Sequence, residues 1–222
     1  GKYSMRGKSD LVSDSKNSSA GLERDYIVRW SYGIDETLNL LIPNFKGGSS
    51  TPFGRDSETV KAIRKNMNSS DSAGPPKYWG TQPLTDGPHY VGAIVFFLFI
   101  LGLIIVRGRE KWWLLIATIL SIMLAWGKNF MPLTDFFIDY FPGYNKFRSV
   151  TFILIISQFC IPLLGALALR DIYNNVIPKK DLLKGFFTTL GITGGLILLI
   201  FLIPGIAGSF LNESEKTSYP GW

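Results

Sequence analysis

The chain of 222 residues carries a net charge of +6, and 46% of its residues are hydrophobic, with a mean hydropathy of +0.19. Its basic residues are spread along the sequence and form no tract, so the composition argues against DNA or RNA as a partner. The single cysteine, Cys160, excludes a disulfide within the chain and a cysteine cluster that could hold a metal. No HExxH, Walker or GxSxG motif is present.

Residues 1–88 are mostly polar, and we predict an extracytoplasmic segment of loops and short helices. A short helix is expected from about Asp35 to Leu41, with Asp35 as its N-cap, and a second is expected to start near Asp56. Between them, KGGSSTPFG (residues 46–54) is typical of a turn or loop. So few apolar residues suggest that this segment leans on the rest of the protein for its stability.

Residues 89–211 are predicted to form a transmembrane domain, because four charge-free runs approach the roughly 17 to 25 apolar residues of a spanning helix. The second run is short, but Lys111 and Lys128 can snorkel and lengthen its reach. The predicted fold class is an all-α polytopic membrane protein with about four transmembrane helices and one interfacial helix. The expected spans are residues 90–106, 112–126, 149–169 and 185–211.

The charges of the connections predict an orientation. Basic residues concentrate in the first and third connections between the spans, and cytoplasmic loops are enriched in such residues. The segment 1–88, the connecting stretch (residues 127–148) and the tail (residues 212–222) are therefore expected to face outward. The basic residues in question are Arg107, Arg109, Lys111, Arg170, Lys179, Lys180 and Lys184.

Polar and small residues inside the spans have two interpretations. Gln158 is a rare polar group at depth, and Pro162 is expected to kink the third span. On the fourth span, Gly191 and Gly195 lie with Thr188 at helical spacing, a face that lets another helix approach. We favour packing for both features, with Gln158 as a secondary site candidate. His89, the only histidine, is expected to be solvated at the membrane interface.

The connecting stretch and the residues that flank it read WGKNFMPLTDFFIDYFPGYNKFRSV. If LTDFFIDYF is a short helix, Asp135 and Asp139 share one face of an amphipathic helix suited to the interface. Lys128, Lys146 and Arg148 then gather at its ends, where ammonium and guanidinium groups can bind a lipid phosphate. A carboxylate beside them can serve as a base or as a sugar ligand. The alternative is an interfacial helix with ordinary snorkelling cations.

Three long segments of the sequence carry a family resemblance: YWGTQPLTDGPHYVGAIVFFLFILG, WGKNFMPLTDFFIDYFPGYNKFRSV and WSYGIDETLNLLIPNFKGGSS. They resemble the bacterial YfhO family of multi-pass membrane proteins, which is related to the GT-C class of glycosyltransferases. The resemblance runs from about Tyr26 to the final YPGW. Because that family's chains are longer, and this sequence opens without an initiator Met, we expect it to be an internal portion of a longer protein.

The resemblance implies a bacterial inner-membrane protein that transfers sugar from a polyprenyl-phosphate donor to an envelope glycan or lipid acceptor on the outward side. The catalytic acid of GT-C proteins usually lies in the first outward loop, which this sequence does not match. Asp135 and Asp139 are therefore only candidates to position the acceptor or a divalent metal, while Lys128, Lys146 and Arg148 are expected to neutralise the donor phosphate. A flippase for a lipid-linked sugar and a non-catalytic membrane scaffold remain as alternatives.

Overall fold

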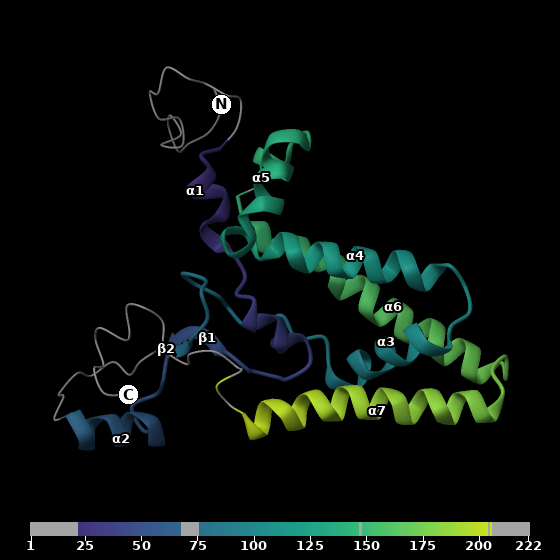
Figure 1. The fold of residues 1–222 in the computed structure, drawn as a ribbon. Coiled ribbons are helices and arrows are strands. Elements are labelled where there is room, and N and C mark those ends of the chain that lie inside the picture. Colours follow the sequence, from purple (N-terminus) through teal and green to yellow (C-terminus); the bar gives the residue numbers. More distant parts are fainter. Residues whose placement is uncertain (1–21, 68–75, 147, 204, 206–222) are drawn as a thin grey trace, which may run out of the picture.

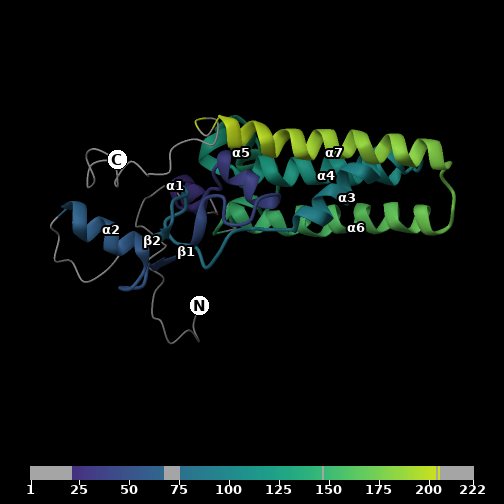
Figure 2. The ribbon, with the colours of Figure 1, turned by 90° about the horizontal axis from the view of Figure 1, so that it is seen from below.

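A computed structural model describes residues 22–67, 76–146, 148–203 and 205. Four long helices run beside one another through most of its length (Figures 1 and 2). The connection between the first two and the connection between the last two lie at one end, where Arg107 pairs with Asp181 at 3.8 Å. The chain segments that precede the bundle lie at the opposite end. The four helices are α3 (Ala93–Ile105), α4 (Glu110–Ala125), α6 (Leu154–Tyr173) and α7 (Lys179–Leu202).

Helix length separates the four predicted spans into two groups. In the described residues, Val150–Tyr173 and α7 are each long and apolar enough to cross a membrane. α3 has 13 residues and is shorter than a crossing requires. α4 reaches sufficient length only if it is counted together with Gly127–Tyr140, from which it is bent by 111°. The structure therefore supports a membrane protein with two spanning helices, or three with the bent pair.

The helix boundaries differ from the expected ones where charged residues continue a helix. α7 begins at Lys179, directly after Pro178, whereas hydropathy alone placed its start at residue 185. It ends at Leu202, and residues 206–222, which include the expected outward tail, lie outside the described part of the chain. α6 continues through Pro162 to Tyr173 without a break.

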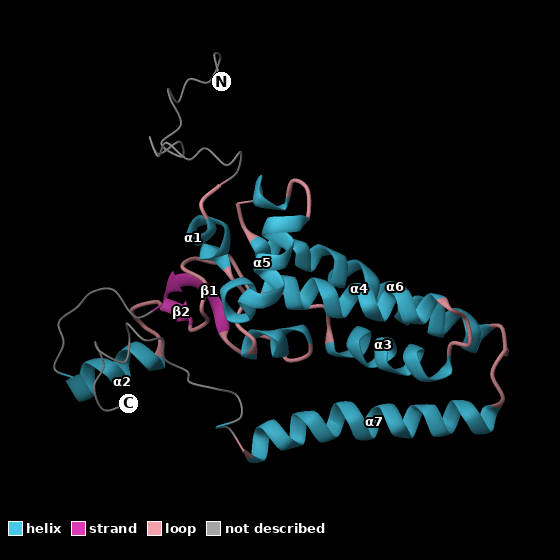
Figure 3. Ribbon diagram, turned by 45° about the horizontal axis from the view of Figure 1, so that its top comes forward, coloured by secondary structure: helices cyan, strands magenta, loops and turns pink. Residues whose placement is uncertain are grey.

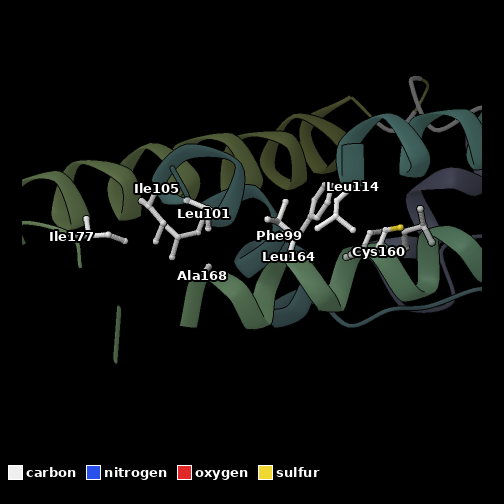
Figure 4. Packing of buried hydrophobic residues seen from close by; sticks show 11 residues of the cluster. Phe99, Leu101, Ile105, Leu114, Cys160, Leu164, Ala168 and Ile177 are labelled. Carbon is white, nitrogen blue, oxygen red and sulfur yellow. The ribbon is translucent and has the colours of Figure 1, made fainter. Parts of the chain in front are cut away.

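The bundle is held by apolar side chains and by glycines that bring the helices together. A Cβ at Gly102 of α3 would lie 2.9 Å from the carbonyl oxygen of Leu164, and one at Gly185 of α7 would lie 2.8 Å from Ile105. Small residues allow such close backbone approach between membrane helices. Figure 4 shows the apolar cluster between these helices, with Phe99, Leu101, Leu114, Cys160, Leu164, Ala168 and Ile177 among its buried members.

The predicted small-residue face of α7 is not the packed one. Gly191 and Gly195 have no atom within 4 Å of an added Cβ, and Thr188 is exposed. The face that packs carries Gly185, Thr189 and Thr193, which lie four residues apart and are buried. Helical spacing identified small residues but could not identify which of two neighbouring faces meets α3.

The segment before the bundle contains a two-stranded sheet that the sequence did not predict (Figure 3). β1 (Gly47–Pro52) pairs antiparallel with β2 (Pro76–Tyr78), so the expected loop at residues 46–54 is corrected to a strand. The pairing is extended by the N–H of Trp79, which donates to the carbonyl of Lys46 at 2.9 Å. Glycines and serines are poor strand formers in isolation, and partners distant in sequence decide this case.

The remaining elements of this segment are short helices, which is the type of element that the sequence predicted for it. The predicted helix at residues 35–41 is a 3-10 helix, Asp35–Leu40, and its N-cap is Ile34. The prediction of Asp35 as the N-cap is therefore wrong, because Asp35 is the first residue within the helix. The Asp35 carboxylate accepts the N–H of Glu36 at 3.0 Å. The helix expected near Asp56 is α2 (Glu58–Met67). The other helices of this segment are α1 (Arg24–Ile27) and the 3-10 helix Val28–Trp30.

Candidate functional site

The connecting stretch turns sharply away from α4 and forms α5 (Met131–Tyr140) after the 3-10 helix Gly127–Phe130. Gly127 has a φ of +47°, and an added Cβ would lie 2.2 Å from the Ser31 Oγ. Only glycine combines that backbone conformation with so close an approach. The turn therefore brings the polar segment that precedes the bundle against the end of α4. This segment, described over residues 22–67 and 76–88, is called the extramembrane segment below.

Asp135 and Asp139 share one face of α5, as the sequence predicted. Both carboxylates bind the guanidinium of Arg24 in α1, with Nη1 on Asp135 and Nη2 on Asp139. The hydrogen bond and the charge of Asp139, with a smaller contribution from Asp135, raise the pKa of Arg24 above its ordinary value. This bridge ties α1 to α5, and the two carboxylates are engaged with a cation.

The engaged carboxylates do not fit a divalent metal. A metal ion would need oxygen ligands that the Arg24 guanidinium already binds. Among the described residues, no group of three or more His, Cys, Asp or Glu side chains is placed to hold one. We derive no step through a metal from these residues.

The predicted cations are placed against the extramembrane segment. The Arg148 guanidinium lies 5.9 Å from the ring centroids of both Tyr26 and Trp30, and Arg29 lies 5.5 Å from the same Trp30 ring. In the described part of the chain neither arginine forms an ion pair with a carboxylate. Two guanidinium groups on one indole ring leave their N–H donors available to an anion. Sequence reasoning missed Arg29, which stands beside Trp30 far from the connecting stretch.

The two lysines of the predicted site are exposed. Lys128 donates its backbone N–H to the Ser31 Oγ at 2.8 Å, which places it beside the residue that follows Trp30. Lys146 ends the 3-10 helix Tyr144–Lys146. Among the described residues, neither lysine forms an ion pair with Asp135 or Asp139. In the part of the chain that the structure describes, the predicted cations therefore form no ion pair with the predicted carboxylates.

Sequence reasoning also missed a buried polar network centred on Glu36. Its carboxylate accepts the Tyr78 hydroxyl at 2.8 Å, the Thr81 N–H at 2.8 Å and the Gly33 N–H at 3.1 Å. The Gln82 amide adds a longer contact at 3.4 Å. Glu36 is 1% exposed, and this set of donors satisfies a carboxylate that would otherwise be costly to bury.

The network changes the chemistry of the groups around Glu36. Burial, followed by the Glu36 charge, raises the pKa of both Tyr32 and Tyr78. Both hydroxyls therefore remain protonated and act as hydrogen-bond donors, Tyr32 to the Glu36 carbonyl at 2.7 Å. Beside them, the buried Lys46 ammonium pairs with Asp35 at 2.5 Å. The network is a rigid support next to the end of α4.

A cavity of about 570 Å³ opens between this support and the end of α4. Its lining is mainly apolar, and its polar residues include Asp35 and Asn129. Asn129 donates its Nδ2 to the Tyr32 carbonyl at 2.8 Å, which leaves the amide oxygen as an acceptor. Ligand sites of this size commonly combine an apolar wall with a few polar groups. The lining includes Ile34, Asp35, Leu38, Thr81, Trp126 and Asn129.

His89 is half-buried, which corrects the expectation of a solvated side chain. Its Nδ1 lies 3.1 Å from the Gln158 amide nitrogen, and its ring makes an edge contact with Tyr32 at 5.6 Å. Burial lowers the pKa of His89, partly opposed by the charge of Glu36. Gln158 thus has a partner outside the bundle and joins α6 to the extramembrane segment.

Comparison of the chain with protein-family models, with curated proteins and with solved structures gave no match.

Proposed function

We propose that this chain is the membrane-embedded part of a GT-C-like glycosyltransferase of the YfhO type. It takes a sugar from a polyprenyl-phosphate donor and transfers it to an envelope glycan or lipid. The reaction takes place on the outward face of a bacterial inner membrane, at the end of the bundle that carries the extramembrane segment.

One observation carries the proposal: residues 29–38 connect two arginine-bearing contacts on the Trp30 ring with a mainly apolar cavity. Arg29 and Trp30, with Arg148 on the same ring, offer guanidinium donors to a phosphate. A few residues further on, Asp35 and Leu38 line the cavity together with Trp126. A sugar ring has apolar C–H faces and hydroxyl groups that suit such a lining, and a sugar phosphate needs both kinds of surface.

The roles of the side chains follow from charge. Transfer from a lipid phosphate develops negative charge on the leaving phosphate, which fixed cations stabilise. Arg148 and Arg29 supply that charge directly, and the exposed Lys128 and Lys146 add to the field around them. Asp135 and Asp139 are occupied by Arg24 and hold α1 against α5, so the proposal gives them a positioning role.

The membrane and the orientation are part of the proposal. The far end carries Arg107 and Arg109 in the connection between α3 and α4 and Lys179 and Lys180 in the first turn of α7. Positive-inside bias favours the cytoplasm for this end. The cavity and the arginine pair then face outward, where a polyprenyl-linked donor and an envelope acceptor meet.

The test uses membranes that contain the protein and a labelled polyprenyl-phosphate sugar, with transfer of the label measured at equal protein level. Arg148→Ala is expected to lower transfer at least tenfold. Arg109→Ala removes an exposed arginine at the opposite end of the bundle and is the matched control, with transfer unchanged. An equal decrease of transfer in both variants would contradict the proposed function. A decrease in Arg148→Ala that is fully explained by a smaller amount of folded protein would contradict it as well.

A second candidate function is a flippase for the same lipid-linked sugar. It is favoured by the engagement of Asp135 and Asp139 with Arg24, because binding without chemistry requires no free base. Reconstituted vesicles separate the two functions: a flippase moves labelled lipid-linked sugar between leaflets without transferring the label. Neither transfer nor movement by the wild-type protein, across several donors, would favour a non-catalytic scaffold.

A further inference from the structure

α4 is too short to cross a bilayer by itself. It begins beside Trp112 and Trp113, which are 58% and 53% exposed and suit a membrane interface. Its 16 residues span about 24 Å, against about 30 Å of hydrocarbon. If the tryptophans mark one interface and α4 stands along the membrane normal, the 14 residues from Trp112 to Ala125 span about 21 Å, and the other end of α4 lies about 9 Å below the opposite boundary.

The chain then turns almost into the membrane plane. The bend of 111° between α4 and the Gly127–Tyr140 segment leaves α5 within about 20° of that plane, at the depth where amphipathic helices insert, about 5 to 10 Å below the headgroups. Figures 1 and 3 show α5 leaving the long axis of the bundle beside α1.

The two sides of α5 have different chemistry. Asp135 and Asp139 are held by Arg24, so the charged side faces the extramembrane segment. Phe136 and Tyr140 are 56% and 76% exposed and lie with ring centroids 5.3 Å apart. Phe141, which follows the helix, is 57% exposed. Phe136 and Tyr140 form an exposed aromatic face on α5, whereas Phe141 lies with its ring centroid 5.5 Å from that of Phe137.

We propose that α5 lies close to the plane of the membrane with this aromatic face inserted at the boundary between the lipid headgroups and the acyl chains. Aromatic side chains are favoured at that depth, where apolar rings and polar tips are both accommodated. If α4 and α5 together formed one span, Asp135, Asp139 and Arg24 would lie in the hydrocarbon. The free-energy cost of charged side chains at that depth is high. The inference concerns attachment to lipid and does not depend on the proposed enzymatic function.

The test measures the depth of spin labels in the protein reconstituted in lipid nanodiscs. Single cysteines replace Phe136 or Tyr140 in a Cys160→Ala background, and collisions with oxygen and with a water-soluble nickel complex report depth. Glu58→Cys, on exposed α2, is the aqueous reference, and Phe159→Cys, exposed on α6, is the hydrocarbon reference.

Labels at positions 136 and 140 are expected at a depth between the two references. The ratio of collisions with oxygen to collisions with the nickel complex should be several-fold higher at these positions than at position 58. A depth equal to that of position 159 would overturn the proposal in favour of a re-entrant or spanning segment. Accessibility equal to that of position 58 would overturn it as well, because the face would then not touch lipid. Midpoints of thermal unfolding close to that of the Cys160→Ala background confirm that the labelled variants are folded.

Discussion

The extramembrane segment and the helical bundle are stabilised in opposite ways. Around Glu36, the segment buries hydrogen-bonded polar groups and an ion pair between Lys46 and Asp35. Between α3 and α6, the bundle brings backbones together at Gly102 and Gly165 and fills the remaining space with apolar side chains. A segment with few apolar residues must satisfy each buried polar group individually, whereas membrane helices satisfy their backbones internally. Loss of one polar group should therefore affect the segment locally, and loss of close packing should affect the bundle.

The largest effect is expected for Glu36→Ala. The change leaves the buried Tyr78 hydroxyl and the N–H groups of Thr81 and Gly33 without their acceptor, at about 1 to 3 kcal/mol for each unsatisfied group. We expect the free energy of opening of this segment to fall by about 3 kcal/mol or more. Amide hydrogen exchange at residues 33–36 and 78–82 should accelerate while exchange in α6 and α7 stays the same.

Glu58→Ala is the control for that prediction. Glu58 is exposed, and its ion pair among the described residues is with Lys61 at 2.8 Å, a surface contact of small energetic value. Exchange at residues 33–36 and 78–82 should not change in this variant. Equally faster hydrogen exchange throughout α6 after Glu36→Ala would show that the extramembrane segment and the bundle unfold as one unit and are not stabilised separately.

Gly102→Ala tests the other side of the comparison. The new Cβ would lie 2.9 Å from the Leu164 carbonyl oxygen, a backbone atom that cannot move alone. Overpacking of this kind costs about 1 to 3 kcal/mol, and the thermal unfolding midpoint in detergent should fall. Gly191→Ala on α7 is the matched control, because nothing lies within 4 Å of its added Cβ. A similar fall in both variants would contradict close packing of α3 on α6.

Local patterns predicted those features that depend on neighbours in sequence. The amphipathic spacing of Asp135 and Asp139 placed both on one face of α5, and hydropathy located the four helices of the bundle. The partner Arg24 lies 111 residues from Asp135, and no local pattern connects the two. Hydropathy also could not show that α3 has only 13 residues or that α4 bends into α5.

The candidate site combines Arg148, which local sequence features could select, with residues that they could not. Arg148 was selected because cations at the entrance of a span suit a phosphate, and the structure places it against the Trp30 ring, which Arg29 also contacts. Glu36 could not be selected, because its donors Tyr78 and Gln82 lie 42 and 46 residues away. β1 was mistaken for a loop because its strand conformation depends on pairing with β2.

A smaller effect is expected where the segment and the bundle meet. The indole N–H of Trp126 donates to the Thr37 hydroxyl at 3.0 Å, and Trp126→Phe removes that bond, worth about 1 kcal/mol. The loss is limited because the Tyr32 N–H still donates to the Ala125 carbonyl at 2.8 Å. Hydrogen exchange at residues 35–40 should accelerate modestly. Trp113→Phe, at the opposite end of α4, should leave it unchanged, and acceleration in both would indicate a general loss of α4 stability.

The smallest effect is expected from pH at His89, which bridges the two regions through Gln158. Burial lowers the pKa of His89 in the folded protein below the unfolded value of about 6.5, so the unfolded chain binds the proton more readily. The contribution of His89 to stability is therefore complete above about pH 7 and decreases as the pH falls below that unfolded value. His89→Gln should remove this dependence, so the gap in unfolding midpoint between wild type and variant should narrow as the pH is lowered. A gap that widens instead would mean that the charge of Glu36 outweighs burial and stabilises the protonated imidazole.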